Sequence, residues 1–189
     1  MSLNSVYLAI AKVRLGRAAI RTRIIRSSVY YASLVCNQLA KPNIYAFNVM
    51  LRGLAATWKK YDFCVELYYK LKSLGLQANN LTCPFLFIAC GNVWGLVRGK
   101  FGHCLVFKAG LDGDEHMNHY LITMYASCGE MGFARKVFDE MGDRDMVSGN
   151  LMMSGYSKTG FFKEAIGLFM KMREEGFEPD EMTLASDLL

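Results

Sequence analysis

The sequence has little of what zinc domains, disulfide-stabilised domains and membrane proteins need. Its six cysteines include no C-x-x-C pair and its three histidines lack ligand-like spacing, so a zinc ribbon or finger is excluded. A disulfide framework is disfavoured in a chain with 52% hydrophobic residues. We expect reduced thiols, with Cys64, Cys90, Cys104 and Cys128 buried as small hydrophobic side chains. The uncharged stretch 73–97 is interrupted by glycine, asparagine and proline, so no run of about 18 apolar residues remains to span a membrane.

Catalytic patterns are also missing. Serine, histidine and aspartate residues are scattered along the chain, and none stands in an arrangement typical of nucleophilic catalysis. We therefore expect no enzymatic activity, no catalytic residue, no cofactor, no bound metal and no small-molecule substrate.

Acidic residues are absent from the first third of the chain. Residues 1–61 contain ten lysines and arginines and no acid before Asp62, whereas residues 62–189 contain 12 basic and 17 acidic residues. Residues 1–30 combine arginines and serines with interleaved apolar residues, the composition of an organellar transit peptide. The alternative is a degenerate first helical repeat that is basic by chance.

The most informative feature is an internal repeat. Residues 124–141 match residues 155–172 at a constant offset of 31 in aromatic, glycine and apolar positions. The matched pairs are Tyr125 and Tyr156, Gly129 and Gly160, Ala134 and Ala165, Val137 and Leu168, Phe138 and Phe169, and Met141 and Met172. Apolar residues recur every three or four positions in 117–128 and 133–141, which predicts two short amphipathic helices. Helices this short need neighbours to bury their apolar sides.

Glycines mark the ends of the predicted helices. Gly129 and Gly160 stand where a tight turn would join two helices of one unit. Gly75, Gly110 and Gly176 each follow an amphipathic stretch and precede an apolar residue, as expected where a helix is closed by a left-handed residue. The expected fold is all-α, a right-handed α-solenoid of helix-turn-helix repeats, similar to tetratricopeptide-like helical hairpins.

With this register the chain resembles the pentatricopeptide repeat family of plant organelle RNA-binding proteins, in the PLS subclass with alternating motif lengths. The resemblance rests on the segment from Met146 to Asp180, on Ala134 to Met141 with Asp145, and on Pro42 to Asn48. The tetratricopeptide repeat is the main rival, but its Trp-x2-Leu-Gly pattern is absent.

The resemblance implies the following division. Residues 1–30 are the transit peptide or degenerate repeat, 31–43 a remnant of a short repeat, and 181–189 a truncated long repeat. Four units lie between them: 44–79 of the standard (P) type, 80–114 of the long (L) type, 115–145 of the short (S) type and 146–180 of the standard type. The chain therefore looks like a short or truncated member.

In this family one base is read per unit by the fifth and the last residue. The resemblance assigns base reading to Asn48 with Asn79, His119 with Asp145, and Asn150 with Asp180. It implies cytosine for the first of these pairs and uracil for the third, and leaves the second undecided because His119 replaces the usual asparagine. Pro84, paired with Asp114, has no side-chain hydrogen bond to offer, so the long unit is expected to read no base.

Further contacts follow from the same register. The second residues of neighbouring units are expected to clamp a base, Tyr45 with Leu81 and Val147 with Met182. Lys158 lies where the family often places a phosphate-contacting lysine, but the other units have Ala56, Asn92 and Ser127 there. Few neutralised phosphates imply weak binding.

The resemblance implies a single-stranded RNA-binding adaptor for organelle RNA editing or processing, in the mitochondrion or alternatively the chloroplast. The H-x-E and P-C-x-x-C patterns of a zinc deaminase are absent, so any editing chemistry would come from a separate deaminase or other editing-complex proteins. Two alternatives remain open: a protein-binding scaffold of truncated helical repeats, and a non-functional fragment of a longer RNA-binding protein.

Overall fold

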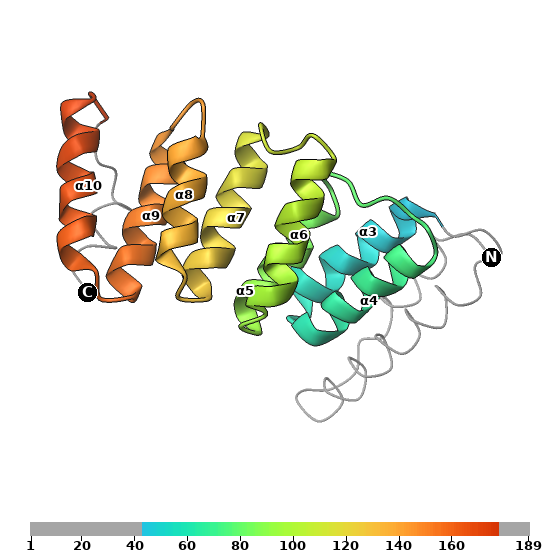
Figure 1. Ribbon diagram of the computed structural model, residues 1–189. Helices are drawn as coiled ribbons and strands as arrows, with labels where there is room; N and C mark the ends of the chain where they lie inside the picture. Colours follow the sequence, from blue (N-terminus) through green and yellow to red (C-terminus); the bar gives the residue numbers. More distant parts are fainter. Residues whose placement is uncertain (1–42, 178–189) are drawn as a thin grey trace.

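A computed structural model describes residues 43–177, and this part of the chain consists of helices joined by short turns, without β-strands (Figure 1). The elements are α3 (Ile44–Arg52), the π-helical turn η1 (Gly53–Thr57), α4 (Tyr61–Ser73), α5 (Cys83–Asn92), α6 (Leu96–Lys108), α7 (Glu115–Ser127), α8 (Met131–Glu140), α9 (Met146–Lys158) and α10 (Phe162–Glu174). The all-α prediction is confirmed. No helix among these residues is both long enough and apolar enough to cross a membrane.

The helices form consecutive hairpins that stack side by side. Helices α3, α5, α7 and α9 pack against one another in sequence, and we call them the first-helix layer. Helices α4, α6, α8 and α10 form the second-helix layer, and each contacts the first helix of its own hairpin; α4, α6 and α8 also contact that of the next. Figure 1 shows this row running from α3 and α4 to α10. Each hairpin thus buries its apolar sides against a neighbour, as in an α-solenoid.

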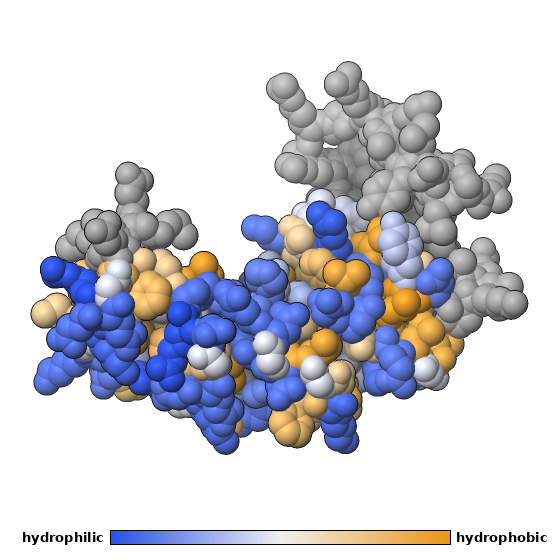
Figure 2. All heavy atoms as spheres, turned by 90° about the horizontal axis from the view of Figure 1, so that it is seen from above, coloured by the Kyte–Doolittle hydropathy of each residue, from blue (hydrophilic) through white to orange (hydrophobic). Residues whose placement is uncertain are grey.

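The core runs through the row without interruption. Its completely buried side chains come from every described hairpin, for example Phe47, Val106, Leu121 and Met152. On the face shown in Figure 2 the described surface is mostly hydrophilic, with hydrophobic side chains in separate groups. The buried stripe on each helix matches the spacing of three and four residues seen in the sequence.

The predicted glycine turns are confirmed. Gly75, Gly110, Gly129, Gly160 and Gly176 all have positive φ angles, between 66° and 91°. Leu111, the residue after Gly110, donates its backbone N–H to Val106 O at 3.1 Å and packs against the core. The residues after Gly75 and Gly176 make the same bond and the same contact in the first and the fourth hairpin. These are the hydrogen bonds that close an α-helix at a left-handed residue.

The first hairpin contains one more residue than the others near its turn, and the structure accommodates it in η1. There Trp58 N donates to Gly53 O at 2.8 Å, five residues back instead of four. A π-helical turn accommodates one additional residue without breaking the helix. The extra residue therefore lies after Asn48 and leaves the beginning of α3 unchanged.

The cysteines are less uniformly buried than expected. Cys64, Cys83 and Cys90 are buried, and burial is the main cause that raises the pKa values of their thiols to about 12, 11 and 12. They therefore stay protonated at neutral pH. The prediction was wrong for Cys104, which is exposed on α6, and Cys128 is only partly buried. Cys104 lies on the side of α6 that no other described helix covers, a placement that the helical period alone did not reveal.

Candidate nucleic-acid interface

The second residues of the four predicted units are all exposed, in the first turns of α3, α7 and α9 and in the turn just before α5. Tyr45 is 66% exposed, Leu81 60% and Val147 51%, and His116 is exposed as well. Because their register is the same in successive helices that pack side by side, they form a row along that layer. His116 was not predicted to contact a base, although the register places it second in its unit. Met182, the predicted partner of Val147, lies outside the described residues.

Asn48 and Asn79, a predicted base-reading pair, are hydrogen-bonded across a separation of 31 residues. Asn48 Nδ2 donates to Asn79 Oδ1 at 3.2 Å, and Asn48 Oδ1 accepts from the Thr82 hydroxyl at 2.7 Å. Asn48 is 8% exposed and therefore counts among the buried polar side chains. An amide has two N–H donors and two acceptor lone pairs, and these bonds use one of each. Asn79 is the more accessible partner.

Thr82 was not predicted as part of this pair, yet it holds both members. Its hydroxyl is completely buried and lies 2.7 Å from Asn48 Oδ1 and 2.9 Å from Asn79 Oδ1. Ser148 has the corresponding place beside Asp145. A threonine or serine third in a unit was the sequence signal that could have identified Thr82 and Ser148. This position lies three residues after the last residue of the preceding unit.

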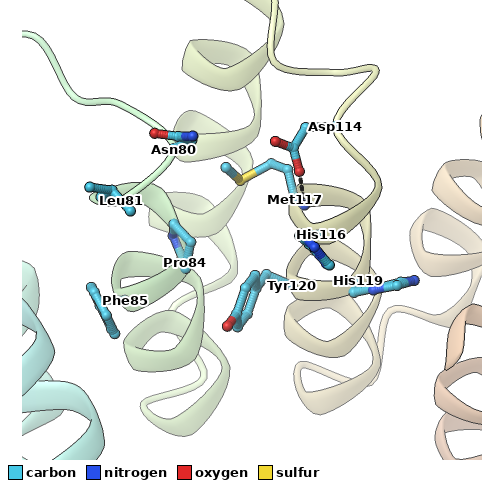
Figure 3. Close-up of a pocket in the computed structure, with 9 residues that line it drawn as sticks. All are labelled: Asn80, Leu81, Pro84, Phe85, Asp114, His116, Met117, His119 and Tyr120. Carbon is cyan, nitrogen blue, oxygen red and sulfur yellow. Dashed lines mark hydrogen bonds between the residues drawn. The ribbon is translucent and has the colours of Figure 1, made fainter.

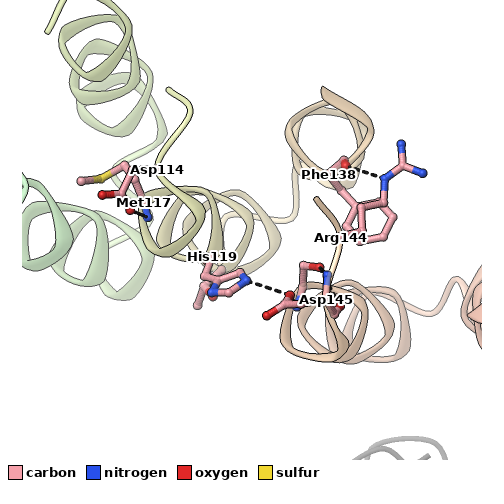
Figure 4. Close-up of polar contacts among 8 residues, drawn as sticks. Asp114, Met117, His119, Phe138, Arg144 and Asp145 are labelled. Atoms are coloured by element: carbon pink, nitrogen blue, oxygen red, sulfur yellow. Dashed lines mark hydrogen bonds and ion pairs between the residues drawn. The ribbon is translucent and has the colours of Figure 1, made fainter. Parts of the chain in front are cut away.

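His119 and Asp145, the second predicted pair, are also in contact. His119 Nε2 lies 3.1 Å from Asp145 Oδ1, and Figure 4 shows the imidazole extending from α7 toward the start of α9. Burial alone would raise the pKa of the Asp145 carboxyl, but hydrogen bonds from the Ser148 backbone and hydroxyl, and further ones with Glu115 and His119, outweigh it and lower this pKa to about 2. Asp145 is therefore a carboxylate, an acceptor only, at neutral pH.

The third predicted pair is described only in part. Asn150 is half-buried in the first turns of α9, whereas Asp180 lies outside the described residues. Lys158, the predicted phosphate contact, is exposed and is the last residue of α9. Asn92 and Ser127, which replace it in other units, are likewise exposed final residues of α5 and α7. Ala56 is exposed within η1.

The last residue of a unit has a second role, because it stands at the beginning of the next first helix. Asp114 Oδ1 accepts the backbone N–H of Met117 at 2.9 Å and caps α7 (Figure 4). Asp145 Oδ1 accepts the N–H of Ser148 at 2.8 Å and, with the Ser148 hydroxyl, forms a capping box at α9. Asn79 Oδ1 accepts the N–H of Leu81 at 3.1 Å in the turn before α5, whose N-cap residue is Thr82. Helix capping by itself favours aspartate and asparagine here.

Among the described residues, Glu115, His119 and Asp145 form the one group that could supply several ligands to a cation. One imidazole nitrogen and two carboxylate oxygens lie within 4.8 Å of one another. Glu115 is exposed, and such groups are common on protein surfaces without a metal ion. We therefore assign the group no metal.

Comparison with known proteins gives one consistent family. Residues 144–186 match the PPR repeat family, and residues 120–146 match the PPR repeat. The chain is 36% identical over 163 residues to a chloroplastic/mitochondrial pentatricopeptide repeat-containing protein of Arabidopsis thaliana, covering 86% of this chain and 25% of the relative. A mitochondrial relative from the same plant is 34% identical over 160 residues, covering 82% and 23%.

Solved structures show the same fold. The pentatricopeptide repeat protein PPR10 from maize, in complex with an 18-nt psaJ RNA element, superimposes with a TM-score of 0.69 at 17% identity, covering 86% of this chain and 26% of that one. The chain thus spans about a quarter of the length of the proteins it matches. The internal repeat, the stacked hairpins and these relatives together show that the chain belongs to the pentatricopeptide repeat family.

Proposed function

We propose that this chain binds single-stranded RNA along its first-helix layer, as a non-enzymatic adaptor in organelle RNA editing or processing. The observation that carries the proposal is a repeated arrangement: an exposed second residue and a hydrogen-bonded pair formed by the fifth and last residues of a unit. This arrangement occurs at Asn48 with Asn79 and again at His119 with Asp145. The complex of PPR10 with RNA supports the proposal for a chain of the same fold.

The proposed chemistry is one unstacked base per unit. The exposed second residues clamp the base from both sides, and Tyr45 supplies an aromatic face. The paired polar side chains then contact the edge of the base. Asn48 with Asn79 takes cytosine, and Asn150 with Asp180 takes uracil. The standard, long, short and standard units of the PLS subclass, 44–79, 80–114, 115–145 and 146–180, supply these positions in order.

The internal hydrogen bonds of a pair support this role. Asn79 holds Asn48 in one orientation, so the amide does not need to be ordered when a base arrives. Thr82 donates its hydroxyl to the Asn48 oxygen, and neither of these two bonds uses the second N–H of the amide. A group oriented in advance loses less conformational entropy on binding.

Location and partners follow from the same proposal. The relatives include chloroplastic and mitochondrial proteins, and residues 1–30 have the composition of a transit peptide. We propose an organelle as the place of action. Editing would use a deaminase or other editing-complex proteins that bind the same RNA.

A protein-binding scaffold is the second candidate, favoured by one observation. Helix α6 and the turn before it expose Trp94, Val97 and Phe107 at 75%, 81% and 70%. These side chains lie in the hairpin whose fifth residue is Pro84, and exposed apolar groups of this kind occur at protein interfaces.

RNA titration of the whole chain tests the proposal. We expect binding to oligonucleotides that carry cytosine and uracil three positions apart, with affinity that falls as salt rises. Asp180→Asn should move the preference at the last unit from uracil to cytosine, because the new pair has the composition of Asn48 with Asn79. Asp62→Asn, an equal change of charge at an exposed residue of α4, should leave the preference unchanged. The absence of any binding at about 10 μM and low salt would refute the proposal.

A further inference from the structure

A cavity between the long unit, 80–114, and the short unit, 115–145, is not explained by base reading through amides. This cavity of about 540 Å³ lies between α5 and α7 (Figure 3). Pro84 and Phe85 border it on α5, and Met117 and Tyr120 on α7. The remaining lining residues are Asn80, Leu81, Asp114, His116 and His119. The cavity thus has an apolar and aromatic interior with polar groups around it.

The cavity occupies the place where this unit would hold its base. Leu81 and His116, the second residues of the long and the short unit, border it on opposite sides. Both side chains are exposed. Pro84 and Asp114 are the fifth and last residues of the unit. Every position of the register that would contact a base is therefore present around one open space.

The polar group that Pro84 lacks is supplied by a residue outside the reading positions. Figure 3 shows the Tyr120 ring extending from α7 toward α5, with its hydroxyl in the space between the helices. Within the described residues this hydroxyl has no hydrogen-bond partner, whereas Asp114 Oδ1 already accepts the Met117 N–H. His119 points the other way, to Asp145. Tyr120 therefore presents a free donor and acceptor within an apolar space.

We propose, on the basis of the RNA-binding function above, that this cavity holds a nucleobase between Leu81 and His116, with Tyr120 as an additional base-contacting residue. This revises the expectation that the long unit reads no base. The base is held by its apolar faces and by one phenolic hydroxyl, not by an amide. Because a hydroxyl donates and accepts equally well, every base can offer it a partner. The unit thus contributes affinity with little preference among the four bases.

An abasic substitution tests this directly. The oligonucleotides contain cytosine and uracil separated by two nucleotides. Both orders of these two bases along the RNA are titrated, and the order that binds more tightly is used for the next step. The nucleotide beside the cytosine, which faces the long unit, is then varied. We expect the four bases to bind within about threefold of one another, and an abasic nucleotide to bind at least about fivefold more weakly, since stacking contributes to every base.

The variant Tyr120→Phe isolates the hydroxyl. It should weaken binding of base-containing RNA about two- to tenfold and leave binding of the abasic RNA unchanged, so that the two changes are not additive. Tyr69→Phe is the matched control, because Tyr69 is an exposed tyrosine of α4 in the second-helix layer. It should leave both affinities as in the original chain.

The outcomes separate this inference from the function on which it rests. RNA that binds and responds to Asp180→Asn, but is insensitive to the abasic nucleotide and to Tyr120→Phe, would overturn the base site alone. The same result is expected if the cavity accepts an apolar peptide side chain instead. No RNA binding by any variant would overturn both proposals.

Discussion

At the scale of single residues, Asp145 connects stability with the proposed reading of RNA. Its Oδ1 caps α9 through the Ser148 N–H at 2.8 Å and also lies 3.1 Å from His119 Nε2. The hydrogen bonds around the carboxylate lower its pKa to about 2 despite partial burial. The folded chain therefore favours the charged form of this group more than the unfolded chain does.

Replacing this carboxylate should destabilise the array. Asp145→Ala removes the cap and the contact with His119, and we expect the free energy of unfolding to fall by about 1–2 kcal/mol. Asp145→Asn keeps an acceptor oxygen and should cost less. Urea denaturation followed by circular dichroism gives both values. Equal losses in the two variants would show that the charge, and not the cap, matters.

The same group predicts a pH dependence. Because the folded pKa lies below the ordinary value near 4, its contribution to stability is complete above about pH 4 and is lost as the pH falls toward 2. Urea midpoints measured across this range should therefore fall more in the original chain than in Asp145→Asn, which cannot titrate at this position. Parallel curves would contradict the lowered pKa.

The pairing of residues was predictable because it depends only on the register. The fifth and last positions of the predicted units paired Asn48 with Asn79 and His119 with Asp145, and in the structure the two members of each pair are in contact. Thr82 and Tyr120 could not be found in this way, since their roles depend on which direction a side chain takes between two packed helices. The burial of Asn48 was also missed, because a polar residue early in a helix is normally exposed.

At the scale of helices, close contact between the two members of a hairpin depends on a glycine. A Cβ atom added at Gly102 of α6 would lie 2.9 Å from Cε1 of Phe87 and 3.0 Å from Cδ2 of Leu86, and both of these side chains are buried in α5. Gly167 of α10, in contrast, has nothing within 4 Å of the same position. The two glycines separate packing from helix propensity.

Alanine at these two glycines should have opposite effects. Gly102→Ala should lower the free energy of unfolding by about 1–2 kcal/mol, because overpacking the α5–α6 contact outweighs the gain in helix propensity. Gly167→Ala should raise it by about 0.5–1 kcal/mol, since only the propensity changes. Thermal or urea denaturation of both variants provides the comparison. If Gly102→Ala stabilised the chain, α5 and α6 would have to pack less tightly than the distances at Gly102 indicate.

The order and the ends of the helices followed from the sequence, and their local distortions did not. Apolar spacing and the glycines at 129 and 160 predicted helices over 117–128 and 133–141, close to α7 and α8. The π-helical turn η1, which accommodates the extra residue of the first hairpin, was not predicted, because an insertion can equally lengthen a loop. Lys59 and Trp94 adopt positive φ where other hairpins have glycine, and composition gave no sign of this.

At the scale of the whole molecule, charge limits the affinity expected of the proposed RNA interface. Residues 62–189 contain 12 basic and 17 acidic residues, and Lys158 is the single lysine among the four corresponding positions at the ends of the first helices. Electrostatic attraction to phosphates supplies most of non-specific affinity for nucleic acids. Base contacts therefore contribute a larger share of the affinity at the proposed interface than they would in a basic groove.

Adding a lysine at a corresponding position should strengthen binding. Ser127 is the exposed last residue of α7, in the first-helix layer, and Ser73 is the exposed last residue of α4, in the second-helix layer. Ser127→Lys should steepen the dependence of log K on log salt by about 0.7, the value for one phosphate of a single strand. Ser73→Lys adds the same charge at a helix end and should leave the slope unchanged. Equal slopes in titrations at several salt concentrations would place the RNA elsewhere.

The proposed double role of a residue that ends a unit, in helix capping and in base contact, restricts how such a chain can evolve. Asp114 and Asp145 hold the beginning of the next helix whether or not RNA is present. Mutation can therefore exchange them cheaply only for other short side chains with an acceptor oxygen, such as asparagine, serine or threonine. A new target sequence would therefore have to be recognised with these few residue types, or through neighbouring residues that do not cap a helix.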